Sequence, residues 1–243
     1  MAEQPKNPWH RGAVIEPLRR AVSGWRERQA LQGRDAQAIF SEYYQRNTWG
    51  SADSRSGRGS DLKQTATLRE VLPKLLSELQ VRRLLDVPCG DFHWMSQVPL
   101  ADVEYIGGDI VPQMVEHNQA HHGREGVTFR HLDLLADELP RADLVLCRDC
   151  LVHFSLADID RAVDRLLASQ STWLLTTVFR DRRSNTDIVT GQWRPLNLLA
   201  PPFNWPWPRL FIEEGCTEDG GRWSDKCLAL WPLEALRTHR ERN

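Results

Sequence analysis

The chain has 243 residues and a mass of 28.0 kDa, and we expect one domain with an N-terminal appendage. Hydrophobic residues make up 41% and charged residues 26%, a balance that excludes a disordered acidic chain and a membrane protein. A net charge of −2 gives no global field that attracts polyanions, so nucleic acid is not an expected partner. The sequence has neither an apolar run of about 18 residues nor the apolar core of a signal peptide. We therefore expect no stable membrane insertion and a cytoplasmic location.

Residues 1–38 are predicted to form an amphipathic helical arm. Ile15, Leu18, Val22 and Trp25 recur at spacings of three and four, as on one face of a helix. Such an arm suits a lid, a dimer contact, a membrane-surface helix or a helix packed on its own domain. The remaining residues, 39–243, are predicted to form the main domain.

The main domain is predicted to begin with a Gly- and Ser-rich loop over 47–60 and a helix over 65–79. Five apolar runs separated by helical stretches follow, a pattern typical of a parallel sheet with helices on both faces. They are RRLLDV (82–87), VEYIGGDI (103–110), VTFRHLD (127–133), ADLVLCRD (142–149) and STWLLTTVF (171–179). Crossover helices are predicted over 111–121 and 156–168, the second capped by Ser155. With a final strand over 225–233, we predict an α/β, Rossmann-like doubly wound, mostly parallel sheet of about seven strands.

Acidic residues dominate the positions where the predicted strands end, which is where doubly wound sheets bind ligands. They are the Asp86–Asp91 turn (DVPCGD), Asp109, Asp133 and the Arg148-Asp149 pair. Asp109 follows Asp86 by roughly the 20 residues that precede a ribose-binding carboxylate in nucleotide-binding units. The first turn has one glycine, Gly90, where a dinucleotide site has three, and its carboxylates would repel a pyrophosphate. This turn favours a cationic cofactor, S-adenosyl-L-methionine (SAM), over NAD and disfavours a nicotinamide oxidoreductase.

The segments LLDVPCGDFHWM, YIGGDI, HLDLL and CRDCLVHFS resemble the successive motifs of class I SAM-dependent methyltransferases. The resemblance covers roughly residues 40 to 233, and WGSADSRSGRGSDLKQTATLR is similar to a segment before the first motif in a bacterial subgroup. It implies an enzyme that transfers a methyl group from SAM to an oxygen, or less readily a nitrogen, of a small molecule or glycan. The cofactor-binding residues that it implies are Trp49, Arg69, Asp86, Pro88, Gly90, Asp91, Trp94, Asp109, Ile110, Asp133, Leu134 and Arg148.

The resemblance also assigns roles to several of these residues. The DVPCGD turn would lie under the methionine part of SAM, Asp109 would hold the ribose, and Asp133 would meet the adenine amino group. Arg69 would pair with the methionine carboxylate, and Arg148-Asp149 would face the transferred methyl group. The alternative for each single Asp is a turn or helix cap without a ligand.

His153 and Asp149 are the candidate catalytic residues. His153 stands four residues after Asp149, so one helical turn would bring both side chains to the same face. A histidine there can remove a proton from an acceptor hydroxyl. The alternative is a histidine bound to the backbone at the start of a helix.

The tryptophan- and proline-rich segment from Trp193 to Pro208 is predicted to be part of an acceptor-binding insertion over about 180–210. Alternatively, its indoles bury the edge of the sheet. The five cysteines are predicted to be reduced, and the Cys147-Cys150 spacing lacks the second cysteine pair of a metal site, so no metal is expected. A catalytically silent SAM-binding or interaction module is the alternative function.

Overall fold

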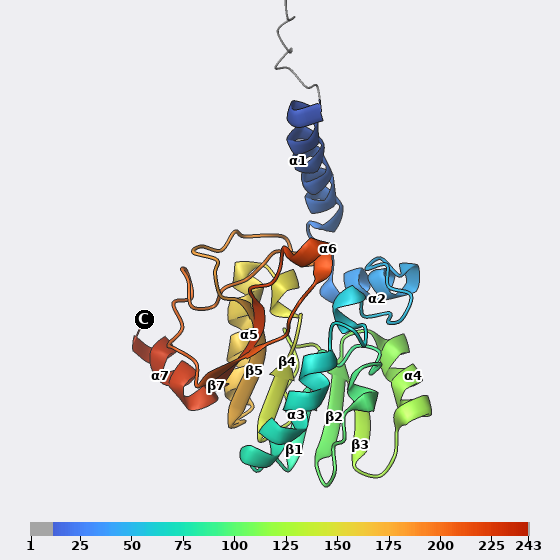
Figure 1. The fold of residues 1–243 in the computed structure, drawn as a ribbon, viewed down its shortest axis with the longest axis vertical. Helices are drawn as coiled ribbons and strands as arrows, with labels where there is room; N and C mark the ends of the chain where they lie inside the picture. The colour runs from blue at the N-terminus through green and yellow to red at the C-terminus, as the bar shows by residue number, and fades with distance from the viewer. Residues whose placement is uncertain (1–11, 243) are drawn as a thin grey trace, which may run out of the picture.

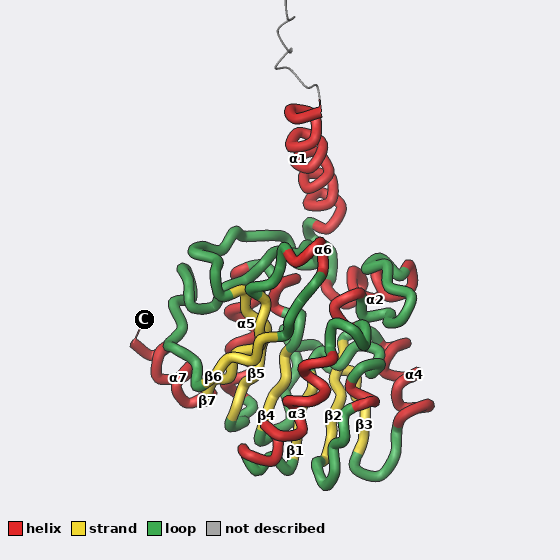
Figure 2. The backbone as a smooth tube through the Cα atoms, in the orientation of Figure 1, coloured by secondary structure: helices red, strands yellow, loops and turns green. Residues whose placement is uncertain are grey.

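The structure is a computed structural model that describes residues 12–242, with side chains described from residue 22 onward. At its centre lies a seven-stranded sheet in the order β3-β2-β1-β4-β5-β7-β6 (Figures 1 and 2). The parallel strands are β1 (Arg83–Asp86), β2 (Glu104–Asp109), β3 (Val127–His131), β4 (Leu144–Cys147) and β5 (Trp173–Phe179). β7 (Lys226–Pro232) pairs antiparallel with β5 and with β6 (Leu210–Glu213). The predicted doubly wound, mostly parallel α/β sheet is confirmed.

Successive residues of the central strands enter two hydrophobic clusters on opposite faces of the sheet. Leu84 packs in one cluster and Leu85 in the other, and Val145 points away from the cluster that holds Leu144 and Leu146. Because both faces are covered, nearly every position of these strands is buried. This explains why the strands appear in the sequence as continuous apolar runs.

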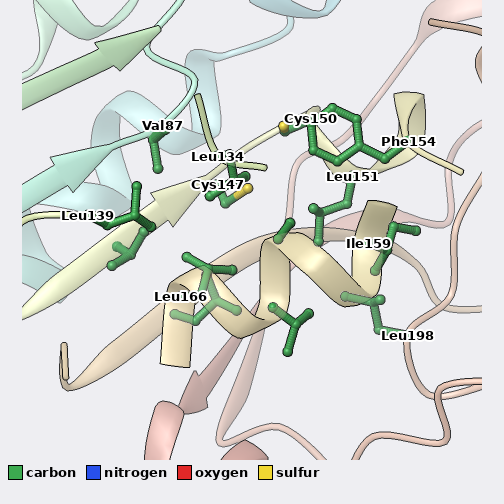
Figure 3. Packing of buried hydrophobic residues seen from close by; sticks show 14 of the residues in the cluster. Val87, Leu134, Leu139, Cys147, Cys150, Leu151, Phe154, Ile159, Leu166 and Leu198 are labelled. Atoms are coloured by element: carbon green, nitrogen blue, oxygen red, sulfur yellow. The ribbon is translucent and has the colours of Figure 1, made fainter. Parts of the chain in front are cut away.

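Helices supply the covering layers. One face is covered by α3 (Ala66–Glu78) through its leucines, and the other by α5 (Leu156–Ala168) and α7 (Leu233–Arg242), while α4 (Pro112–His122) packs on β2 and β3. Figure 3 shows Ile159 and Leu166 of α5 in the same buried cluster as Cys147 of β4. The Ser155 hydroxyl accepts a hydrogen bond from the Asp158 amide, so the predicted cap of α5 is confirmed.

The connection between β1 and β2 contains no α-helix. Residues 87–103 form a loop with one 3-10 turn, Met95–Gln97, although the predicted pattern alternates strands with helices. Gly90 and Phe92 both have φ of +57°, a left-handed conformation that interrupts any helix beginning after Pro88. The segment that follows β1 is therefore a loop, at a position where the predicted alternation has a helix.

The predicted N-terminal helix is present as α1 (Gly12–Leu31), which projects away from the sheet in Figure 1. Of its predicted apolar stripe, Val22 and Trp25 are exposed, whereas the side chains of Ile15 and Leu18 lie outside the described residues, as does the structure of residues 1–11. A second helix, α2 (Ala36–Arg46), spans the predicted boundary at residue 38 and is buried against the domain through Ile39 and Phe40. The division into an arm and a domain stays a prediction.

Residues 180–209 contain no named helix or strand, and they lead to β6 and the short, kinked α6 (Glu218–Gly221). β6, α2 and α7 were not anticipated from the sequence. All five cysteines are unpaired, as predicted, and all five are also buried. Across residues 12–242, every helix is too short or too polar to span a bilayer.

Candidate functional site

A cavity of about 420 Å³ lies beyond the carboxyl ends of β1, β2 and β4. It is lined by all but one of the site residues predicted from the sequence, namely Trp49, Asp86, Pro88, Gly90, Asp91, Trp94, Asp109, Ile110, Asp133, Leu134, Arg148, Asp149 and His153. The exception is Arg69, on the first turn of α3, whose guanidinium turns back to donate to the carbonyl of Leu62 at 3.0 Å. Arg69 therefore has no atom in the cavity wall, in contrast to its predicted pairing with a methionine carboxylate.

Asp109 ends β2 with a buried carboxylate that organises the turn on either side. Its Oδ2 accepts from the Gly90 amide and its Oδ1 from the Val111 amide, both at 3.0 Å. Burial raises the pKa of Asp109 to about 6, although the two backbone hydrogen bonds favour the ionised form. Each carboxylate oxygen has a second lone pair. Asp109 can therefore accept further hydroxyl donors from a ligand in the cavity.

Two more carboxylates lie at neighbouring strand ends. Burial raises the pKa of Asp86 to about 7, while the Tyr105 hydroxyl, which donates to Oδ2 at 2.7 Å, opposes this shift. Asp133 accepts from the Leu135 amide at 2.8 Å through Oδ1. Three carboxyl groups at one edge of the sheet favour a ligand that carries positive charge.

The loop over 51–57 lies against the turn after β1 because Asp91 binds it. Asp91 accepts from the Ser54 hydroxyl at 3.1 Å and from the Arg55 amide at 2.7 Å, and its own amide donates to the Ser56 hydroxyl at 2.8 Å. A Cβ at Gly90 would lie 2.2 Å from Ser56 Oγ, and φ at Gly90 is +57°, so this position requires glycine. The carboxylate of Asp91 thus serves to hold one wall of the cavity.

Asp149 belongs to a buried network of four charged side chains. Lys226 Nζ lies 2.6 Å from Asp149 Oδ2, and Arg148 donates to Glu214 Oε2 through Nε at 3.1 Å and Nη2 at 2.6 Å. Arg148 Nη2 also donates to the Gly59 carbonyl at 2.8 Å. The side chains of Arg148, Glu214 and Lys226 are 4%, 1% and 5% exposed. Burial alone would raise the pKa of Asp149, but the Lys226 and Arg148 charges hold it well below its usual range.

His153 lines the cavity as a neutral imidazole. Its Nδ1 lies 3.1 Å from the Gln192 carbonyl, which can only accept, so Nδ1 carries the proton and Nε2 is the basic nitrogen. Burial lowers the pKa of His153 to about 4. Its ring packs against Phe40 and Trp49, with centroids 6.2 and 6.0 Å apart.

The predicted helical turn between Asp149 and His153 is absent. Asp149 has φ of +53°, and Leu151–His153 form a 3-10 turn, so the two residues do not share one face of an α-helix. Both side chains nevertheless line the cavity. The Gln192 carbonyl orients His153, whereas Lys226 and Arg148 pair with Asp149.

The tryptophans of the segment from Trp193 to Pro208 divide between the two predicted roles. Trp193 lines the cavity and packs edge-to-face on Trp223, with centroids 4.8 Å apart. Trp205 is buried against Trp231, and Trp207 is exposed beside the sheet edge. Trp193 thus belongs to the cavity wall, whereas Trp205 and Trp207 lie away from it. The assignment of 180–210 as an acceptor-binding insertion stays a prediction.

No protein-family model matches the sequence, and no curated protein matches it. Solved structures with similar folds include the N-methyltransferase NodS from Bradyrhizobium japonicum bound to S-adenosyl-L-homocysteine (SAH), with 16% identity and a TM-score of 0.57 over 82% of this chain and 98% of that one. Human N-acetylserotonin methyltransferase in complex with SAM has 17% identity and a TM-score of 0.51, covering 82% of this chain and 60% of that chain's length. The methyltransferase domain of bacterial CtHen1 has 11% identity and a TM-score of 0.51, over 71% and 100%.

The chain has the fold of class I SAM-dependent methyltransferases. It spans less than two thirds of the human enzyme's length. The likeness to a bacterial subgroup rests on the sequence segment alone and stays a prediction.

Several cavity residues were missed from the sequence, above all Lys226, Trp223, Glu218 and Asp219. Lys226 opens β7, and because β7 is antiparallel, its first residue lies at the same edge of the sheet as the last residues of the parallel strands. The sequence signal available was a lysine directly before the apolar run CLALW. To place that lysine in the site, one would have had to know that the strand runs antiparallel to its neighbours.

Proposed function

We propose that this protein is a SAM-dependent methyltransferase that methylates an oxygen of a small molecule or glycan. The observation that carries the proposal is the buried Asp109 carboxylate at the end of β2, bound to the Gly90 amide and open to the cavity in a methyltransferase fold. SAM, when bound, supplies an electrophilic methyl group, so positioning provides much of the rate.

The cavity offers a place for each part of SAM. Asp109 would accept the ribose hydroxyls, and Asp133 and Leu134 would contact the adenine. The turn from Pro88 to Gly90 would lie under the methionine part. His153 Nε2 would accept the proton of the acceptor hydroxyl, a transfer that a neutral imidazole allows at pH 7.

Asp109→Ala is expected to weaken SAH binding at least tenfold, because two charge-assisted hydrogen bonds of roughly 1.5 to 3 kcal/mol each are lost. Titration calorimetry on the folded variant measures the change. Asp143→Ala is the matched control, since Asp143 also accepts two backbone amides, those of Arg82 and Arg83, but lies outside the cavity. An unchanged SAH affinity in Asp109→Ala would contradict the assignment. SAH binding with no methyl transfer to a broad acceptor panel would favour the catalytically silent module.

We further propose Arg58, in place of Arg69, as the partner of the methionine carboxylate. Three cationic side chains of the described residues line the cavity, and two of them, Arg148 and Lys226, are bound to carboxylates. Arg58 is exposed and forms no ion pair within the described part of the chain.

Arg58→Ala is expected to weaken SAH binding about threefold to tenfold while leaving the affinity for 5′-methylthioadenosine unchanged. That compound keeps the adenosine and sulfur but lacks the carboxylate, so calorimetry with both ligands isolates the charge pair. Arg55→Ala, on the same loop and outside the cavity wall, should bind both ligands like the wild type. Equal losses for the two ligands in Arg58→Ala would rule out the pairing.

A further inference from the structure

The part of the cavity beyond Asp149 is both acidic and aromatic. Glu218 and Asp219 from α6 and Glu27 from α1 line it, together with Trp193 and Trp223. Within the described residues, none of these three carboxylates forms an ion pair. Their contacts are neutral: Asp219 accepts from the Trp223 indole at 2.8 Å, and Glu27 lies 3.3 Å from the Gln192 amide.

Glu218 lies close to the charged network described above. A Cβ at Gly59 would lie 3.2 Å from Asp149 Oδ2, 3.4 Å from Glu218 Oε2 and 3.5 Å from Lys226 Nζ, so these groups surround one point of the wall. Here Asp149 and Glu214 pair with Arg148 and Lys226, two carboxylates with two cations, and Glu218 adds a carboxylate that forms no ion pair within the described residues. Asp219 and Glu27 add further negative charge to the lining, whose one other cation among the described residues is Arg58, while the Arg182 and Arg222 guanidiniums near Trp223 lie outside the lining.

The aromatic wall has a surface that suits a cation. Trp223 already carries the Arg222 guanidinium 4.8 Å from its ring centroid and that of Arg182 at 5.4 Å. Trp193, packed edge-to-face on Trp223, is 41% exposed and lines the same cavity. Indole faces attract ammonium groups more strongly when carboxylates lie nearby and water is partly excluded.

We propose that the acceptor is a hydroxylated arylalkyl amine whose ammonium group binds between Glu218, Asp219 and the face of Trp193. This inference rests on the proposed function and adds the acceptor's charge and shape to it. The unpaired carboxylates attract an ammonium group and repel acceptors that carry a carboxylate or phosphate. The amine is the anchor that presents the rest of the acceptor to Asp149 and His153.

The test compares three probes that share a phenyl ring and differ in charge: phenethylamine, 2-phenylethanol and 3-phenylpropionate. Dissociation constants come from ligand-observed NMR titrations of protein saturated with SAH. We expect the amine to bind at least tenfold more tightly than the propionate and more tightly than the alcohol. Amine binding that is undetectable, or no tighter than that of the alcohol, would overturn the proposal.

Two conservative variants assign the effect to named carboxylates. Glu218→Gln and Asp219→Asn should each weaken phenethylamine binding about threefold to fivefold and leave 2-phenylethanol binding unchanged. Asparagine tolerates the left-handed conformation of Asp219, whose φ is +49°, so this variant keeps the backbone. Glu70→Gln, on the exposed surface of α3, is the matched control and should bind all probes normally. Wild-type amine affinity in both cavity variants would refute the assignment.

Failure of the acceptor proposal and failure of the proposed function are distinguishable. SAH binding is measured first by calorimetry. Loss of the amine preference with SAH binding intact overturns only the acceptor class, whereas absence of SAH binding counts against the proposed function. In that case the three titrations without SAH still decide whether the cavity selects amines.

Discussion

His153→Ala is expected to lower the rate of methyl transfer about 100-fold while SAH affinity stays within twofold of the wild type. The imidazole is oriented by the Gln192 carbonyl and presents Nε2 as a proton acceptor, a function that alanine cannot replace. Its pKa of about 4 means that protonation removes the base only in acid. The wild-type rate should therefore fall as the pH drops below about 4 and should not depend on this group above pH 6.

The measurement is SAH release against pH with an acceptor found by screening amino alcohols. His121→Ala, at the exposed end of α4, is the control and should keep both the rate and the pH profile. Asp149→Asn should have a smaller effect, because Asp149 does not hydrogen-bond His153 and is bound by Lys226. A wild-type rate and profile in His153→Ala would mean that the histidine is structural and that catalysis proceeds by positioning alone.

Glu214→Gln is expected to lower the free energy of unfolding by about 3 to 5 kcal/mol, the range found when one partner of a buried ion pair is removed. Glu214 Oε2 accepts two hydrogen bonds from Arg148 and lies 3.6 Å from Lys226 Nζ, with the side chain almost fully buried. The neutral amide would leave Asp149 as the one carboxylate of the described residues that forms ion pairs with the two buried cations. Denaturant unfolding followed by circular dichroism gives the change.

The adjacent residue provides the control. Glu213 is the last residue of β6, directly before Glu214, and forms an ion pair with Arg180, but its side chain is 57% exposed. Glu213→Gln should therefore change the stability by less than about 1 kcal/mol. Equal losses in the two variants would mean that burial of the Glu214 pair is not what stabilises the network.

The fold was predictable because the central strands are buried on both faces. A run such as WLLTTVF cannot be half-exposed, and its flanking helices carry clear apolar spacing, as Leu156–Ala168 shows by matching its predicted bounds. β6 was not predictable for the opposite reason. It is four residues long, it has one buried position, and within the described sheet it pairs with β7 alone.

The strand-end carboxylates were predictable because parallel strands place their last residues along one edge. Side-chain partners across long sequence distances were not. Asp91 binds a loop 35 to 37 residues earlier, and Arg69 turns to Leu62 instead of the cavity, and neither contact leaves a periodic pattern. The likeness to known motifs pointed to Asp149 and His153, and both residues line the cavity. The helical turn that we predicted between them was wrong.

The antiparallel direction of β7 has a consequence for the order in which the chain can assemble during synthesis. β6 leaves the ribosome before β7 but lies outside it, so β7 must insert between β5 and a strand that has no other partner in the described sheet. Until residues 226–232 emerge, β5 is the edge strand of the sheet and is open to intermolecular pairing. Until then Asp149 also lacks its partner Lys226, which lies 77 residues later in the chain. Residues up to 179 can thus form the parallel sheet with its edge of carboxylates, whereas the cavity wall that contains Trp223 and Lys226 closes only after residues 226–232 emerge.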